Sequence, residues 1–103
     1  MAEIIWTSNA LNDIDQIAEF ISADSMYYAQ QFVHNLLVST NKLRKYPEIG
    51  KRLPEISSPD YREILFKKYR IIYKYSGEQV FIITIHHSAR LLINNKNLED
   101  LFE

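Results

Sequence analysis

Apolar residues recur with the period of an α-helix through the first part of the chain. Between residues 8 and 22 the apolar stripe consists of Leu11, Ile14, Ile17, Ala18 and Ile21. Acidic and amide side chains occupy the opposite side, so this segment is predicted to form an amphipathic helix of about four turns. The β-branched and aromatic run Glu3–Thr7 predicts a short edge-type strand before it, and Ser8 or Asn9 is expected to cap the helix.

A second helical stripe begins after the polar break at residues 22–25. It starts at Ala29 and continues to Tyr46, and Pro47 and then Gly50 end the helical pattern. The break supplies a new N-cap. Because it is only four residues long, the two helices are predicted to form an antiparallel hairpin.

The pattern changes to that of β-strands after residue 60. Three runs rich in Ile, Tyr, Phe and Val span Tyr61–Phe66, Tyr69–Tyr75 and Gln79–His86. Ser76–Glu78 is a typical hairpin turn, whereas the turn at Lys67 and Lys68 lacks glycine, so strand pairing must enforce it. Residues 47–59 are expected to form an ordered loop, and residues 98–102 a last helical turn or an ordered tail.

The order strand, helix, helix, loop and three strands predicts an α+β fold. The N-terminal strand and the helical hairpin are expected to pack on one face of a small, mainly antiparallel sheet. The first strand must join this sheet from far away in the sequence, and we expect it at an edge. The length of 103 residues predicts one domain, spanning residues 1–103.

The composition excludes several classes of protein. The hydrophobic fraction of 47% is too high for a disordered chain, and the absence of cysteine excludes disulfides and cysteine-ligated metals. The longest run of apolar residues and threonine, Val80–Ile85, is too short to cross a bilayer, and the N-terminus has no secretory pattern. These features predict a cytoplasmic protein that does not act in a membrane.

The formal net charge of −1 conceals a separation of charge along the chain. Residues 1–41 contain five acids and no Lys or Arg, a net charge of −5. Residues 42–75 contain ten bases and four acids, which gives +6, and residues 76–103 contain two bases and four acids, which gives −2. Such asymmetry indicates either a face for an anionic partner or an accidental clustering of solvated charges, and charge alone does not choose between them.

No metal site and no cofactor are expected. His86 and His87 are adjacent, so on a strand they point to opposite faces and cannot share a metal. His34 has no second ligand at helical spacing. With only Gly50 and Gly77, the chain has no glycine-rich phosphate loop.

The remaining candidates for chemistry are cations on or beside the sheet. Arg62, Arg70 and Arg90 lie in or near the predicted strands, and Lys74 shares a row with Arg70. An arginine flanked by β-formers needs a carboxylate partner or an open groove. For Arg70 two interpretations stay open: a structural ion pair with Glu63 or Glu55, or recognition of an anion or a partner.

Several motifs together resemble the RelE/ParE superfamily of bacterial type II toxins, and the ParE branch most closely. The resemblance runs nearly end to end, and its strongest parts are Tyr69-Arg70-Ile71-Ile72-Tyr73 and Ile85-His86-His87-Ser88-Ala89-Arg90. Further matches are the opening Ile-Ile-Trp-Thr strand, Ala10-Leu11, Asp13-Ile14, Ala29, Phe32, Tyr46-Pro47-Glu48-Ile49-Gly50-Lys51-Arg52 and Arg62-Glu63.

The resemblance implies a toxin of a toxin–antitoxin system, of the kind linked to plasmid stabilisation. Its implied partner is a cognate ParD-like antitoxin, which we expect to lie over the hairpin and the sheet edge. A homodimer or a toxin–antitoxin heterotetramer is also implied.

The superfamily divides by mechanism. RelE-like members cut messenger RNA on the ribosome, and in that case the resemblance assigns catalysis to Arg62, Arg70, His87 and Arg90. However, Ile64 stands where a second lysine of the nuclease pattern would fall. Ser88 and Asn94 stand where an arginine and a tyrosine are expected.

Because several residues of the nuclease pattern are missing, the resemblance favours a ParE-like toxin that inhibits DNA gyrase by protein contact, without catalysis. Near-neutral net charge also argues against direct nucleic-acid binding. On this reading the target-binding residues are Arg62, Arg70, Lys74, His87 and Arg90. The alternatives are a RelE-like ribosome-dependent mRNA endonuclease, or an inactive member that only binds its antitoxin.

Overall fold

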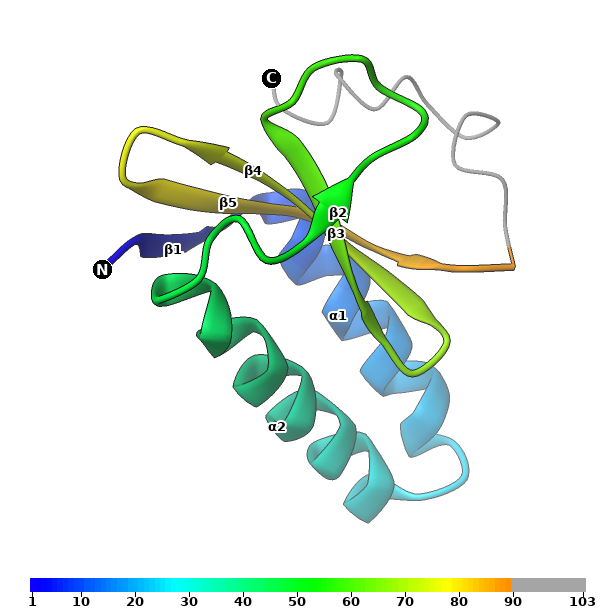
Figure 1. The fold of residues 1–103 in the computed structure, drawn as a ribbon. Helices are drawn as coiled ribbons and strands as arrows, with labels where there is room; N and C mark the ends of the chain where they lie inside the picture. Colours follow the sequence, from blue (N-terminus) through cyan, green and yellow to red (C-terminus); the bar gives the residue numbers. More distant parts are fainter. Residues whose placement is uncertain (90–103) are drawn as a thin grey trace.

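A computed structural model gives the structure of residues 1–89, so the expectations for Arg90, Asn94 and residues 98–102 lie outside the described residues. The elements, in order, are β1 (Glu3–Trp6), α1 (Ser8–Ser22), α2 (Met26–Asn41), a 3₁₀ turn (Lys42–Arg44), β2 (Lys51–Arg52), β3 (Tyr61–Phe66), β4 (Tyr69–Ser76) and β5 (Gln79–His87). The predicted hairpin and the three predicted strands are therefore confirmed (Figure 1).

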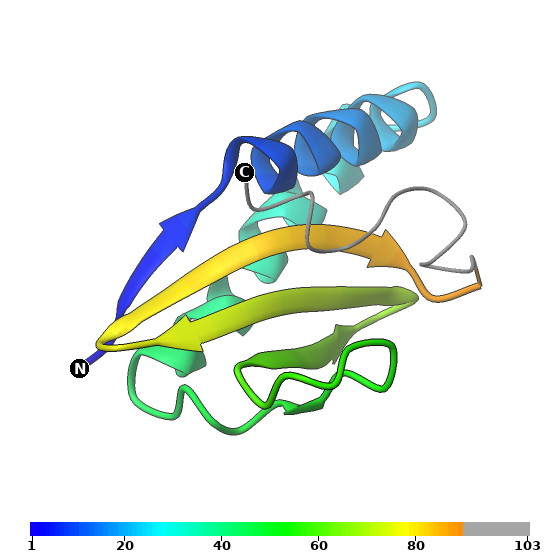
Figure 2. The same ribbon diagram turned by 90° about the horizontal axis from the view of Figure 1, so that it is seen from above.

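The five strands form one sheet in the order β1-β5-β4-β3-β2 (Figure 2). β1 lies at an edge, as predicted, and pairs parallel with β5, with Glu3 opposite Gln79 and Trp6 opposite Ile82. The other neighbours pair antiparallel. The α+β prediction with a mainly antiparallel sheet is thus confirmed.

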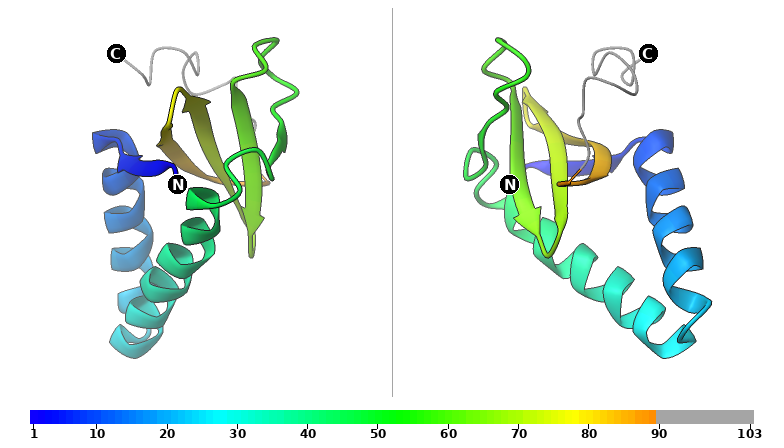
Figure 3. Two further views of the ribbon diagram at one scale, coloured as in Figure 1. Left: turned by 60° about the vertical axis from the view of Figure 1, so that its left-hand side comes forward. Right: turned by 90° about the vertical axis from the view of Figure 1, so that its right-hand side faces the viewer.

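The helical hairpin covers one face of the sheet, and the main core lies between them. Figure 3 shows the two helices meeting at their connecting turn and diverging toward the sheet. The buried side chains of this core include Ile14, Phe32, Leu36, Leu43, Ile64, Ile71, Tyr73, Val80, Ile82 and Ile85. Burying each large apolar side chain contributes about 1.5–3 kcal/mol, so this layer supplies most of the driving force for folding.

The opposite face of the sheet is partly covered by the loop between β2 and β3 (Figure 3). Leu53 of this loop packs with Ile72 and Ile83 in a second, smaller core, against which Ile56 and Tyr61 also pack. The prediction of a loop over residues 47–59 missed β2. A two-residue strand has no measurable period, so only its pairing with Arg62 and Glu63 defines it.

Two boundary predictions are wrong. The cap of α1 is Thr7, neither Ser8 nor Asn9, because Thr7 has extended backbone and its hydroxyl accepts from the Ala10 amide at 3.2 Å. The second helix does not continue regularly to Tyr46. It ends at Asn41 and tightens into the 3₁₀ turn, which places Leu43 in the core. The break before α2 does supply its cap, Ser25.

Within residues 1–89, no helix has both the length and the apolar character needed to span a bilayer.

Candidate functional site

Arg62 lies on the row of β3 that faces the helices, and its guanidinium binds the protein's own backbone. Its Nη1 donates to the carbonyl oxygen of Gly50 at 2.9 Å and, less closely, to that of Glu48 at 3.3 Å. Ile64, two residues along the same row, is part of the main core. Arg62 therefore holds the loop that leads into β2.

Arg70 lies on the opposite face of the sheet and pairs with two carboxylates. It forms two hydrogen bonds to Glu55, at 2.7 and 2.8 Å, and two to Glu63, at 2.6 and 3.1 Å. Only 12% of the Arg70 side chain and 5% of the Glu63 side chain are exposed. Both partners named in the ion-pair interpretation are therefore engaged at once.

This network shifts the pKa values of its members. Hydrogen bonding from Arg70 lowers the pKa of Glu55 below its ordinary value, against a smaller opposing effect of burial. Hydrogen bonds to Glu55 and Glu63 raise the pKa of Arg70, so its charge is permanent. Because Glu55 belongs to the loop and Glu63 to β3, Arg70 fastens the loop to the sheet.

The other two predicted residues within residues 1–89 are packed against aromatic rings. The amine of Lys74 lies 5.8 Å from the centre of the Tyr61 ring. The ring of His87 meets that of Tyr69 edge to face, with centroids 5.3 Å apart, and its Nδ1 accepts from the Ala89 amide at 3.1 Å. Tyr69 in turn packs on Phe32 of α2, which puts His87 on the helix-facing side.

The predicted site residues are not brought together. Arg62 and His87 face the helices, whereas Arg70 pairs with residues of the opposite face. Arg62 stands opposite Tyr73 and His87 opposite Tyr69 in the sheet register. Those partners are four residues apart on β4, which corresponds to about 13 Å along a strand. Among the described residues no three His, Asp or Glu side chains are grouped in a way that suits a metal ion.

Sequence analysis did not single out one buried anchor, the phenol of Tyr73 on β4. Its hydroxyl donates to the carbonyl oxygen of Pro47 at 2.8 Å and accepts from the amide of Gly50 at 2.9 Å. Burial raises the pKa of this phenol. A Cβ at Gly50 would lie 2.5 Å from the Tyr73 oxygen, so only glycine fits. The Tyr-Pro-Glu-Ile-Gly segment, whose Pro47 and Gly50 match this anchor, was the available signal.

A second unforeseen group is the carboxylate of Asp13 on α1. Its Oδ2 accepts from the Thr84 hydroxyl at 2.5 Å and from the Ile85 amide at 3.0 Å, at the edge of β5 beyond the end of β1. Burial raises the pKa of Asp13, and the hydrogen bonds from Thr84 and Ile85 partly oppose this. Asp13 thus completes the hydrogen bonding of a strand edge.

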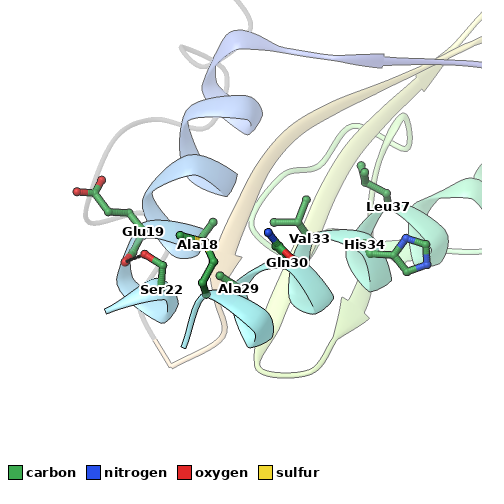
Figure 4. Close-up of a pocket in the computed structure, with 9 residues that line it drawn as sticks. Ala18, Glu19, Ser22, Ala29, Gln30, Val33, His34 and Leu37 are labelled. Atoms are coloured by element: carbon green, nitrogen blue, oxygen red, sulfur yellow. Dashed lines mark hydrogen bonds between the residues drawn. The ribbon is translucent and has the colours of Figure 1, made fainter. Parts of the chain in front are cut away.

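A groove with a volume of about 590 Å³ runs along the hairpin between α1 and α2. Figure 4 shows residues of both helices lining it, with Glu19 at its α1 margin. The lining residues are Ala18, Glu19, Ser22, Met26, Ala29, Gln30, Val33, His34 and Leu37. They are mostly apolar, and none of them is a lysine or an arginine.

Comparison with known proteins agrees with this architecture. The family model described as ParE toxin of the type II toxin–antitoxin system parDE matches residues 4–92. A protein named Toxin RelE2 from Caulobacter vibrioides is 33% identical over 92 residues, covering 88% of this chain and all of the relative.

Among solved structures, a chain of the chromosomal ParDE system of P. aeruginosa superposes with a TM-score of 0.71. It covers 84% of this chain and 96% of that chain, and at 19% identity it shows the fold alone. The fold and the comparisons thus define a small toxin of the RelE/ParE superfamily. The chain belongs to the ParE toxin family of type II toxin–antitoxin systems. Membership of this family implies an antitoxin partner.

Proposed function

We propose that this toxin inhibits DNA gyrase by protein contact and has no catalytic activity of its own. The observation that supports this most strongly is the separation of Arg62, Arg70 and His87. Each is engaged by neighbouring groups of the same chain, and the two arginines lie on different faces of the sheet.

Cleavage of RNA requires catalytic side chains that lie closer together than these three do. A general base and a general acid must each reach the reacting oxygens within hydrogen-bonding distance, and a cation must stabilise the charge that develops on the phosphate. Arg70 is neutralised by two carboxylates, and Arg62 is occupied by two backbone carbonyls. Moving either into a nuclease site would break a buried ion pair or release the loop before β2.

Two activity assays on the purified toxin test this proposal. In the first, gyrase supercoils relaxed plasmid with and without toxin; in the second, translating ribosomes carry a defined messenger RNA. Loss of supercoiling with intact messenger RNA is the expected result. Intact supercoiling with ribosome-dependent cleavage would support the endonuclease alternative, and no effect in either assay would support the inactive, antitoxin-binding alternative.

The antitoxin is proposed to dock in the groove of the hairpin. The groove is apolar, and residues 1–41 contain no Lys or Arg. It therefore suits a segment with an apolar face and basic flanks, since opposite charge at the rim favours association. Unfavourable like-charge contact would exclude an acidic segment.

Leu37→Glu tests this docking, with the adjacent Val38→Glu as its control. Leu37 lines the groove and is 45% exposed, whereas Val38 is 60% exposed and does not line it. We expect Leu37→Glu to weaken antitoxin binding by about tenfold or more, because a buried unpaired carboxylate costs several kcal/mol. Val38→Glu should leave the affinity within about threefold. The affinity of each variant is measured by titration with the antitoxin encoded beside the toxin gene. An equal loss of affinity in both variants would place the docking site elsewhere.

A further inference from the structure

Residues 42–52, here called the basic platform, contain five exposed cations close together in the chain. Its exposed cations are Lys42, Arg44, Lys45, Lys51 and Arg52, and its exposed acid is Glu48. Within residues 1–89, the two ion pairs both involve Arg70, so none of these five cations is neutralised by a carboxylate there. Arg44 donates to the Asn41 side chain at 2.8 Å and Arg52 to the Ser57 carbonyl at 3.0 Å, but these partners are uncharged, so both arginines keep an uncompensated positive charge, unlike Arg70.

The basic platform is held in place by buried contacts. Leu43 is fully buried, and the Ala2 amide donates to the Arg44 carbonyl at 2.8 Å. Tyr73 binds both Pro47 and Gly50. Arg62 holds the carbonyls of the same turn. A segment fixed in this way loses little conformational entropy when a partner binds, which is the property of a preorganised docking surface.

Two large apolar side chains stand among these cations. Tyr46 is 54% exposed and Ile49 is 56% exposed, although both lie on a turn that is otherwise anchored. The Lys45 amine lies 5.6 Å from the centre of the Tyr46 ring. Exposed tyrosine and aliphatic side chains surrounded by Arg and Lys are typical of the energetically important centre of a protein–protein interface.

We propose that the basic platform is the docking surface for the toxin's protein target, and that it binds an acidic surface patch bearing apolar side chains. The proposal rests on the proposed function in assuming a protein target, but it replaces Arg62 and Arg70 as the residues that contact it. A nucleic acid fits less well, because Ile49 cannot stack on a base and the hairpin beside the platform has a net charge of −5 over residues 1–41.

The test compares Lys51→Glu with Lys68→Glu in the full-length toxin. Both lysines are exposed, and both substitutions change the net charge by the same amount. Lys68 lies in the turn after β3, whereas Lys51 pairs with Glu63 earlier on that strand. Binding of immobilised gyrase and of a labelled single-stranded RNA is measured at two salt concentrations, and growth arrest is measured in cells without antitoxin. Thermal unfolding confirms that both variants fold.

For Lys51→Glu we expect gyrase binding at low salt to fall by about tenfold or more and growth arrest to be relieved, since an interface cation replaced by an acid meets like charge. Lys68→Glu should stay within about twofold of the parent. If the parent arrests growth without binding gyrase, the proposed function fails. The platform proposal then depends on growth arrest alone, and relief by Lys51→Glu but not by Lys68→Glu supports it.

Three results would overturn the platform proposal. The first is equal behaviour of the two variants in both gyrase binding and growth arrest. The second is tighter binding of the labelled RNA than of gyrase with the same sensitivity to Lys51→Glu, which would make the platform a nucleic-acid surface. The third is a parent protein that neither binds gyrase nor arrests growth.

Discussion

The phenol of Tyr73 fixes the course of the chain between α2 and β2, although it lies on β4. Its hydroxyl satisfies one donor and one acceptor of the turn at Pro47 and Gly50, inside the core. Buried backbone groups of this kind cost free energy when they lack a partner. Tyr73 therefore stabilises the basic platform from the side of the hydrophobic core.

Removing this hydroxyl should be costly. Tyr73→Phe leaves the Pro47 carbonyl and the Gly50 amide without their partner, so the free energy of unfolding should fall by about 1–3 kcal/mol. Tyr75→Phe is the matched control on the same strand, and its effect should stay within about 0.5 kcal/mol. Chemical denaturation of the three proteins checks this, and an equal loss in both variants would show that the anchor contributes nothing specific.

Glu55 should make the stability of the protein depend on acid pH. Its pKa is lower in the folded state than the ordinary 4.5 of the unfolded chain, because Arg70 hydrogen-bonds to its ionised form. The stabilising contribution is therefore present above pH 4.5 and is lost as the pH falls through the folded-state pKa. The difference in unfolding free energy between the parent and Glu55→Gln should be constant near neutrality and shrink in acid.

The control for this titration is Glu48→Gln, which removes an exposed carboxylate of the segment that precedes β2. Urea unfolding at a series of pH values should give parallel curves for Glu48→Gln and the parent. A Glu55→Gln curve that also runs parallel to the parent down to the lowest pH would contradict a stabilising ion pair between Glu55 and Arg70.

The sequence predicted some of these residue contacts and not others, for a physical reason. The carboxylate partners of Arg70 were foreseen as Glu63 or Glu55, because side chains of opposite charge can be recognised in a sequence. The contacts of Arg62 and Tyr73 are made to backbone atoms of Glu48, Pro47 and Gly50. Backbone atoms are the same at every position, so no pattern of residue types reveals them.

At the level of elements, α1 does more than cover the sheet, because its first turns also complete the edge of β5. Thr7 donates to the Ile82 carbonyl at 2.8 Å, Asn9 to the Ile83 carbonyl at 3.0 Å, and Asp13 accepts from Ile85. These side chains replace the hydrogen bonds that β1 would make if it were longer. An otherwise open edge is thereby closed to unwanted pairing.

Thr7→Val tests this junction because valine has nearly the same shape but lacks the hydroxyl. It removes the cap of the Ala10 amide and the bond to Ile82, so we expect a loss of about 1–2 kcal/mol in unfolding free energy. Ser8→Ala removes the hydroxyl of one of the two residues that the sequence predicted as the cap, and it should change stability by less than about 0.5 kcal/mol. If denaturation showed a larger loss of stability for Ser8→Ala than for Thr7→Val, the assignment of Thr7 as the cap of α1 would be wrong.

Periodicity predicted the elements well where they are long and poorly where they are short. The two helices and the three long strands show several repeats each, which made their type clear. β2 has two residues, and the tightening of the chain at Lys42–Arg44 changes the period within one turn. The turn at Lys67 has a positive φ of 53° without glycine. As expected from the missing glycine, it joins strands that pair through six residues each, from Tyr61 opposite Lys74 to Phe66 opposite Tyr69.

For the molecule as a whole, the charge separation along the sequence corresponds to two different surfaces. The hairpin, without Lys or Arg in residues 1–41, carries the apolar groove proposed for the antitoxin. The basic platform begins where the hairpin ends and is proposed for the target. Two partners of opposite charge preference can in this way be distinguished by different surfaces of the same chain.

The most direct test of the central claim is a titration of gyrase with the purified toxin. A contact inhibitor should abolish supercoiling once the toxin saturates the gyrase, with no further change over time, and the antitoxin should restore activity. Supercoiling that persists at excess toxin, while each toxin molecule cuts many messenger RNAs on ribosomes, would contradict the proposal of inhibition without catalysis.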